Sequence, residues 1–259
     1  MFNRIIIICS FILASTTIAK SQNKEEQLYQ YAVKLHEDGK LNDALTIFKN
    51  LLKNDSSNIN LLQNTSILYS TIGHSLKEGT PNKYNWYTTA EYLAKKAIQQ
   101  NQMSANAHYA YAMAIGLLSE KAGVKTKINN AKLIKTEAET TIKLDPKIAG
   151  AYHILGRWHL VVAGFNSFER GMITMIFGKM PGGSYEDAIA NFQTAIKLEP
   201  LNAIHYLQIA YTYQEREKKG DKLLAIANLN TAIKIVPRNE DEQITKKECE
   251  DLLSKLKTK

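Results

Sequence analysis

Two residues on one predicted helix carry the clearest chemistry in this sequence. His153 and Arg157 stand four residues apart in an apolar, helix-forming stretch, which places them one turn apart on one helix face. An imidazole and a guanidinium in this arrangement are two donors that suit a carboxylate or a phosphate. The alternative is structural, with Arg157 paired to an acid across the hairpin, Glu169 or Glu186.

The other reactive residue types form no catalytic pattern. His159 lies on a different helix face from His153, and His108 and His205 recur at packing positions of their own helices. Cys249 has no histidine context that would make it a nucleophile. The sequence also lacks a glycine-rich phosphate loop and a Gly-x-Ser-x-Gly elbow. We therefore predict no enzyme activity, no cofactor and no metal site.

The helices that carry these residues are predicted from the spacing of apolar and small side chains. Between Ala149 and Leu198 such positions recur every three or four residues, as they do on one face of a helix. The two stripes consist of Tyr152, Leu155, Gly156 and His159, followed by Ala188, Phe192 and Ala195. A glycine inside a helix costs about 1 kcal/mol relative to alanine, so Gly156 indicates that another helix approaches its backbone closely.

This helical hairpin recurs and resembles the tetratricopeptide repeat, a helix–turn–helix unit of about 34 residues. Pro200 and Pro237 close successive units 37 residues apart, whereas Pro146 and Pro200 are separated by 54, so the fourth unit contains an insert. The units are Glu25–Asn58, Ile59–Ser104, Ala105–Ile148, Ala149–Asn202 and Ala203–Asn239. We predict an all-α fold, a tetratricopeptide-like right-handed α-solenoid of about five helical hairpins over residues 22–239. A capping helix over residues 240–259 would cover its last apolar face.

The insert in the fourth unit, residues 164–183, is strongly apolar. Its large apolar side chains include Phe165, Phe168, Met172, Ile176 and Phe177. They are too many for a loop that lies free in water. We predict a short helix packed on the solenoid, with two alternatives: a lid over the groove, or a wedge that faces a membrane or a partner.

Residues 1–21 are predicted to be a signal peptide. Arg4 precedes an apolar run from Ile5 to Ala14, and the small residues Ala19 and Ser21 suit cleavage after Ser21. The run is shorter than the roughly 20 residues that span a bilayer, which favours removal over the alternative of an uncleaved anchor. The expected location is therefore exported and periplasmic, with membrane association left open.

The chain is moderately basic, with a net charge of +8 that falls to +6 without residues 1–21. The lysines gather in two clusters, Lys121, Lys125, Lys127, Lys132 and Lys135, and Lys246, Lys247, Lys255, Lys257 and Lys259. Solvated helix faces explain such clusters, and the alternative is contact with anionic phospholipid or a polyanionic glycan. Nucleic acid is not a predicted partner, because aromatic residues are not interleaved with the basic ones.

One segment resembles the signature of a known family, the regulator of microtubule dynamics proteins. The similar residues are Leu155–Trp158, Glu169–Arg170, Ile176–Lys179, Pro181 and Ser184–Ala188. The resemblance is clear over Ala149–Pro200 and diffuse elsewhere. It implies a helical interaction module without catalytic residues, with membrane association and lipid binding attributed to some eukaryotic relatives. The export signal argues against a microtubule role for this chain.

The predicted function is non-catalytic binding in a groove enclosed by the first helices of the hairpins. The residues expected to line it are Tyr109, Met113, His153, Arg157, Leu207 and Tyr211. Tyrosine and arginine often carry the binding energy of interfaces. The predicted partner is a protein, a peptide or an amphipathic ligand. The alternative is lipid or membrane contact through the insert and the lysine clusters.

Overall fold

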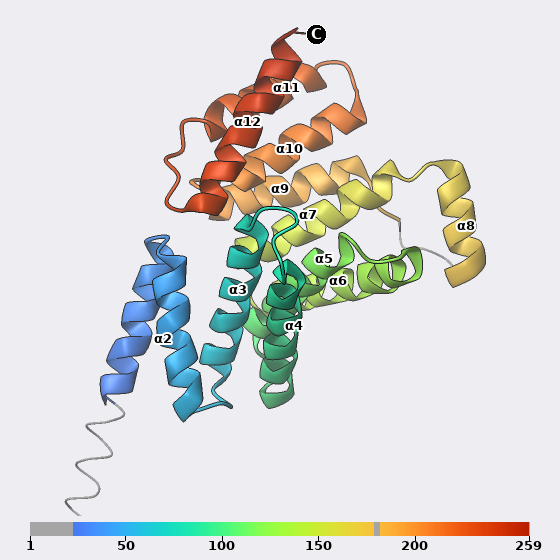
Figure 1. Ribbon diagram of the computed structural model, residues 1–259. Coiled ribbons are helices and arrows are strands. Elements are labelled where there is room, and N and C mark those ends of the chain that lie inside the picture. Colours follow the sequence, from blue (N-terminus) through green and yellow to red (C-terminus); the bar gives the residue numbers. More distant parts are fainter. Residues whose placement is uncertain (1–22, 179–181, 259) are drawn as a thin grey trace, which may run out of the picture. The chain divides into compact units, whose positions relative to one another are not determined.

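The computed structural model describes residues 23–178 and 182–258, except for the side chains of Ile176 and Phe177. The predicted signal peptide lies outside the described residues. Every regular element within them is a helix, and the chain forms two compact units, Met1–Ser56 and Ser57–Lys259. The predicted all-α, tetratricopeptide-like solenoid is confirmed (Figure 1).

The first unit is one helical hairpin. Its helices are residues 23–37 and α2 (Leu41–Asn54). The turn between them places Gly39 at a φ of 77°, in the left-handed region that glycine adopts without a Cβ clash. Ala44 and Phe48 are fully buried, so a small and a large residue one turn apart make the contact between the two helices.

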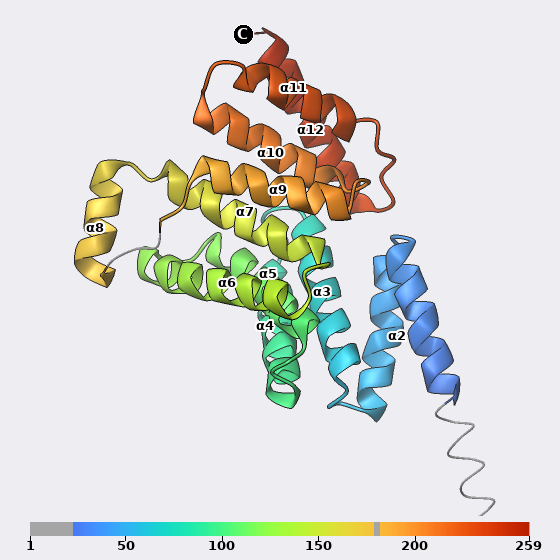
Figure 2. The same cartoon turned by 180° about the vertical axis from the view of Figure 1, so that it is seen from behind.

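The second unit contains four hairpins and a final helix (Figures 1 and 2). They are α3 (Ile59–Ser75) with α4 (Lys83–Gln100), α5 (Ala105–Ser119) with α6 (Val124–Leu144), α7 (Ala149–Gly164) with α9 (Tyr185–Leu198), α10 (Ala203–Arg216) with α11 (Asp221–Ala232), and α12 (Glu240–Thr258). The insert contributes α8 (Ser167–Phe177). Each first helix begins at the residue where the sequence pattern begins a unit.

A small residue at one fixed position lets each second helix approach the first. The eighth residues of α3, α5, α7 and α10 are Ser66, Ala112, Gly156 and Ala210, and all four are buried. A Cβ built on Gly156 would lie 2.8 Å from a ring carbon of Phe192 in α9, which is too close for two carbons in contact. The close approach predicted at Gly156 is confirmed.

The last helix, α12, covers the end of the stack. It contacts α10 and α11, and Cys249, Leu252 and Leu253 are buried in the core that these helices share. Its opposite face is rich in charged residues. This is the arrangement that a terminal helix of a solenoid needs, with one apolar side inward and one polar side outward.

Candidate functional site on the inner ring

Five helices of the second unit contact one another in a closed sequence, and we call them the inner ring. α3 contacts α5, α5 contacts α7, α7 contacts α10, α10 contacts α12, and α12 contacts α3. Four of these are the first helices of hairpins, which are the helices predicted to line a groove. The positions of their side chains decide which of the predicted residues can reach a ligand.

Three charged side chains from other parts of the inner ring act on His74, and we call the four residues the His74 cluster. They are His74 in α3, Glu120 at the end of α5, Arg157 in α7 and Asp241 in α12. Nδ1 of His74 lies 2.6 Å from Oδ1 of Asp241. This hydrogen bond is the main reason that the pKa of His74 is raised, against the effect of burial, and Glu120 raises it further while Arg157 lowers it. The cluster therefore joins helices that lie far apart in the sequence.

Arg157 is the exposed member of an otherwise buried segment. Leu155, Gly156 and Trp158 are buried, and the Trp158 indole donates a hydrogen bond to the carbonyl of Ala131 in α6 at 2.8 Å. Packing against α6 and α9 thus accounts for these neighbours. Arg157 is exposed to solvent, so packing does not account for it.

The structural alternative for Arg157 is wrong for the two acids that we considered. Glu169 closes a capping box with Asn166 at the start of α8. Glu186 lies 2.6 Å from Lys218 and 3.5 Å from Arg216. Both acids are therefore engaged by other groups, and the Arg157 guanidinium keeps its planar fork of donors for another acceptor.

His153 lies near Arg157 but is engaged by neighbouring helices, so it does not serve as a second ligand donor, contrary to the prediction. Its Nδ1 lies 2.9 Å from Nδ1 of His205, and its ring packs edge-on against Phe192 at 5.6 Å between centroids. Burial, together with the nearby His205 and Arg157, holds the pKa of His153 well below its usual value. The His153–His205 pair is a packing contact between α7 and α10.

The remaining predicted groove residues fall into two classes. Leu207 is fully buried, so its prediction as a ligand contact is wrong. Tyr109 packs over the backbone of Gly150, and burial raises the pKa of its phenol. Met113 and Tyr211 are half-buried and stay candidates. The groove is therefore filled in part by the protein's own side chains, and Arg157 is the member of the predicted set that is exposed.

The insert forms a helix, as predicted, but α8 projects from the hairpins instead of packing on them. In both views it stands beyond the end of α7 and does not lie over α3 or α12 (Figures 1 and 2). Arg170 anchors it by donating hydrogen bonds to the carbonyls of Val162 at 2.7 Å and Ala163 at 3.0 Å. These carbonyls belong to the last turn of α7, where main-chain carbonyls have no hydrogen-bond donor within the helix.

The apolar side chains of α8 divide between two faces. Ile173 is buried, whereas Phe168 and Met175 are 75% and 80% exposed and Met172 is 43% exposed. Phe165, before the helix, is half-buried. Ile176 and Phe177 were also predicted to belong to this surface, and their side chains lie outside the described residues. The exposed residues Phe168, Met172 and Met175 form a stripe at helical spacing, which we call the α8 stripe.

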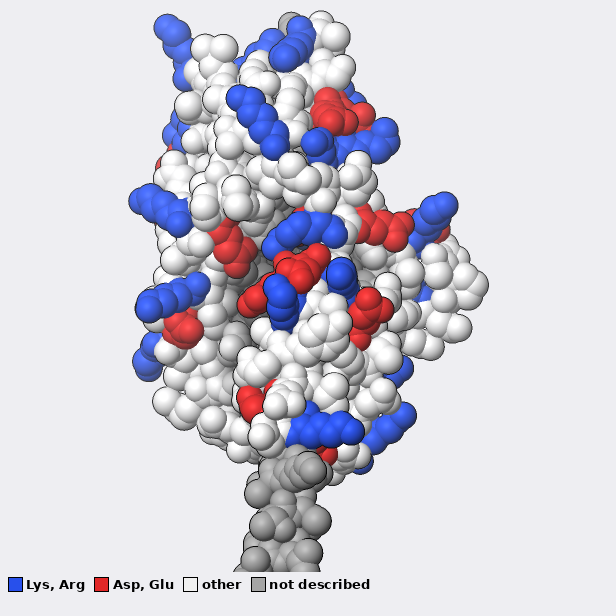
Figure 3. Space-filling view, turned by 90° about the vertical axis from the view of Figure 1, so that its left-hand side faces the viewer, with Lys and Arg blue, Asp and Glu red and all other residues white. Residues whose placement is uncertain are grey.

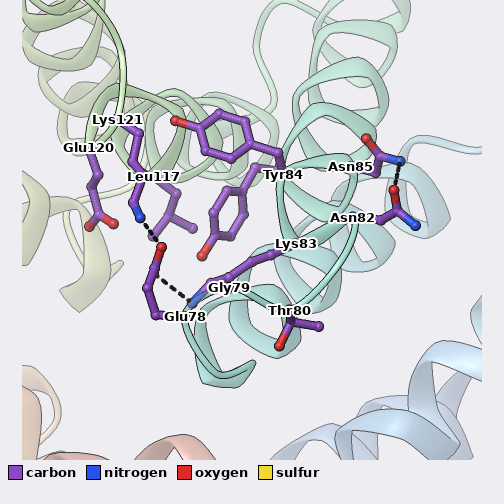
Figure 4. A pocket seen from close by; sticks show the side chains of 11 residues that line it. Glu78, Gly79, Thr80, Asn82, Lys83, Tyr84, Asn85, Leu117, Glu120 and Lys121 are labelled. Carbon is purple, nitrogen blue, oxygen red and sulfur yellow. Dashed lines mark hydrogen bonds and ion pairs between the residues drawn. The ribbon is translucent and has the colours of Figure 1, made fainter.

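A cavity of about 390 Å³ opens where the α3–α4 connection meets the end of α5 (Figure 4). Glu78 pairs there with both Lys121 and Lys83. The hydroxyls of Tyr84 and Tyr87 each donate to a main-chain carbonyl at 3.2 Å. Because these charges and hydroxyls already have partners, the cavity offers few groups that could attract a ligand or perform chemistry.

Positive charge is not concentrated in one basic patch on the face shown in Figure 3, where lysine and arginine side chains lie among aspartates and glutamates. In the first predicted lysine cluster, Lys121 pairs with Glu78, and Lys135 pairs with Glu139 beside the Trp158 ring. The described helices include no segment that is both long and apolar enough to cross a bilayer.

Groups suited to metal or thiol chemistry are scarce. Within residues 23–178 and 182–258, no three histidine, cysteine, aspartate or glutamate side chains are arranged to hold a metal ion. Cys249 is fully buried, and desolvation raises the pKa of its thiol to about 12. Since the thiolate is the reactive form, this cysteine is inert at neutral pH.

His74 and Asp241 were not among the predicted site residues. These residues are 167 positions apart, and neither belongs to a recognisable motif. His74 lies in the last turn of one helix and Asp241 in the first turn of another, where charged residues are ordinarily solvated. Their contact arises from the curvature of the stacked hairpins, for which the sequence contains no local signal.

Comparison with known proteins gives a consistent result. Residues 28–257 match the family described as Regulator of microtubule dynamics protein 1-3. Regulator of microtubule dynamics protein 1 of Bos taurus is 34% identical over 163 residues, which are 62% of this chain and 50% of that protein. The protein of the same name from Pongo abelii is 28% identical over 237 residues, which are 90% of this chain and 73% of that protein. This chain thus spans about half the length of the bovine relative.

A solved structure supports the fold. The crystal structure of a thermophilic tetratricopeptide repeat protein from Thermus thermophilus aligns with a TM-score of 0.57 and 16% identity. The alignment covers 87% of this chain and 98% of that one. At this level of identity the likeness concerns the architecture alone, which is a stack of helical hairpins.

Proposed function

The chain belongs to the regulator of microtubule dynamics family, and we propose that it is a non-catalytic scaffold that binds a protein or peptide partner on its inner ring. The observation that carries this proposal is Arg157. It is an exposed guanidinium in a segment whose neighbours are buried, and the two acids first considered as its partners, Glu169 and Glu186, are engaged elsewhere. A guanidinium in this position forms paired hydrogen bonds with a carboxylate.

The surroundings of Arg157 favour one carboxylate over a polyanion. His74 is already bonded to Asp241, and Glu120 is exposed within electrostatic reach of the same histidine. Two acids in the cluster would repel a phosphate with two charges more strongly than a single carboxylate. The half-buried Met113 adds apolar contact area on the neighbouring α5. We therefore propose an acidic side chain or a chain terminus of a partner as the group that Arg157 binds.

Replacement of Arg157 tests this function directly. The probe is a library of fluorescent decapeptides in which a glutamate is present or replaced by glutamine. Loss of a hydrogen bond to a charged group costs about 1.5–3 kcal/mol, so Arg157→Ala should weaken binding of the glutamate peptides about 10- to 100-fold. Lys143→Ala, at an exposed position on α6, should not change binding. Equal capture by the Arg157 variant, with an unchanged circular dichroism spectrum, would refute the proposal.

A second candidate function is contact with a membrane surface through the α8 stripe. The observation that favours it is the exposure of Phe168 and Met175, with Met172 between them on one face of a projecting helix. Because the surface charges are mixed, burial of apolar side chains would drive this contact, and it should persist as salt concentration rises.

Vesicle sedimentation tests the membrane function. The wild-type protein should sediment with phosphatidylcholine vesicles and with vesicles that contain phosphatidylserine, at low and at high salt. A variant with serine at Phe168, Met172 and Met175 should stay in solution. No sedimentation of the wild-type protein with either vesicle would eliminate this function.

We also propose that the chain is exported and that its mature form begins at Gln22, as the signal-peptide pattern of residues 1–21 predicts. Sequencing the amino terminus of the protein from the periplasmic fraction tests this, and an intact Met1 would contradict it. An exported chain does not meet tubulin, so we do not extend the microtubule role in its relatives' name to this protein. Purified protein should accordingly stay in the supernatant when microtubules are sedimented.

A further inference from the structure

The contact between α3 and α12 joins the first and last helices of the second unit. In a solenoid, each repeat ordinarily contacts only its neighbours, and here the helices from α4 to α11 lie between the two in sequence. This contact closes the inner ring. Its strength therefore affects how far the ring can open around Arg157.

The contact is made by the end of one helix and the start of another. His74 lies in the last turn of α3 and Asp241 in the first turn of α12. A cation is favoured at a helix carboxyl end and an anion at a helix amino end, so both helix dipoles stabilise this pair when His74 is protonated. The two side chains are 43% and 25% exposed, so the proton of His74 exchanges readily with solvent.

Charged groups from three other helices face this pair. Glu120 at the end of α5 and Arg157 in α7 act on His74 with opposite signs. Lys83 in α4 donates a hydrogen bond to the His74 main-chain carbonyl at 3.3 Å. The phenol of Tyr87, also in α4, lies within electrostatic reach of Glu120 and Asp241. With all of these groups present, the pKa of His74 is raised, with the Asp241 hydrogen bond as the largest cause.

The two halves of α12 are held differently. Its second half is fixed by the buried residues Cys249, Leu252 and Leu253. Its first turn exposes Glu240 and Gln243. A connection without α-helix, residues 233–239, precedes it. The buried apolar contacts of α12 therefore lie beyond its first turn, in which Glu242 is bonded to Arg238 and Asn239 of the same connection.

We propose that His74 and Asp241 form a proton-dependent clasp, which holds the inner ring closed while His74 is protonated and releases the first turn of α12 when His74 is neutral. A hydrogen bond between an imidazolium and a carboxylate is about twice as strong as one between neutral partners, and deprotonation also removes the charge that the α3 dipole favours. The consequence for binding at Arg157 rests on the proposed function, whereas the opening itself does not.

Distance measurements between two spin labels test the clasp. The labels are attached to Lys77→Cys, after α3, and Gln243→Cys in α12, both of which are exposed positions, while the buried Cys249 stays unmodified. From about pH 6 to about pH 9, across the range in which a histidine with a raised pKa loses its proton, the share of long distances should rise at least about threefold. A control pair at Asn60→Cys and Gln99→Cys, within the α3–α4 hairpin, should not change.

Two variants separate the clasp from a general effect of pH. His74→Gln and Asp241→Asn should each show the long distances at both pH values, with circular dichroism spectra that match the parent protein. A distance distribution that is the same at both pH values in the parent protein, or short distances retained in both variants, would overturn the inference. Neither outcome would affect the test of Arg157, because peptide capture is measured independently.

Discussion

Replacing Gly156 by alanine tests the contact on which the fourth hairpin depends. The new Cβ would lie 2.8 to 3.0 Å from three ring carbons of Phe192, and this ring is fully buried and packed against His153. Adding a methyl group to a filled core costs about 1–3 kcal/mol. Alanine is more favourable than glycine inside a helix by about 1 kcal/mol. We expect Gly156→Ala to lower the free energy of unfolding by about 1 kcal/mol, the balance of these two effects.

A matched glycine in α5 provides the control. Gly116 also lies inside a first helix, but a Cβ there would meet nothing within 4 Å. Gly116→Ala should therefore raise the free energy of unfolding by about 0.5–1 kcal/mol. The assay is urea denaturation followed by far-ultraviolet circular dichroism.

Adding Phe192→Leu to Gly156→Ala should cost less than the sum of the two single changes, because the smaller side chain relieves the clash. If Gly156→Ala stabilised the protein as much as Gly116→Ala, the close approach of α9 to α7 would be refuted.

Three further predictions concern buried ionisable groups. His153 binds a proton near pH 6.5 when the chain is unfolded, but burial and His205 hold its pKa lower in the folded protein. Its contribution to the free energy of unfolding is therefore complete above about pH 6.5 and is lost as the pH falls, with a slope of up to about 1.4 kcal/mol per pH unit. Urea titrations at a series of pH values measure this slope, and His153→Phe should flatten it. Asp221→Asn should lower the free energy of unfolding by about 1.5–3 kcal/mol, because the carboxylate is 3% exposed and lies 2.6 Å from Arg216. The pKa of Asp221 is lowered chiefly by Arg216, so the contribution of Asp221 to the free energy of unfolding should disappear in urea titrations as the pH falls below about 4. A variant Asp221→Asn that is as stable as the parent protein at pH 7 would contradict this. The Cys249 thiol, with its pKa raised to about 12, should react with a maleimide in urea but not in the folded protein.

The errors in the predicted groove have a common physical cause. Helical periodicity identifies the stripes on a helix, but it does not show which stripe faces the neighbouring hairpin and which faces open space. Leu207 and His153 were assigned to the open stripe, and both contact neighbouring helices instead. Arg157 was assigned to the same stripe and is exposed.

The sequence by itself determined that the fold is helical, where the first helices of the last four hairpins begin, and that the fourth hairpin closes at Gly156. These features depend on interactions within one turn or between two adjacent helices, such as the position of Gly156 opposite Phe192. Only the tertiary structure decided that His74 meets Asp241, that His153 meets His205, and that α8 projects with Phe168 exposed. Small rotations between successive hairpins accumulate along a solenoid, so contacts between distant helices depend on the whole stack and not on any local pattern of residues.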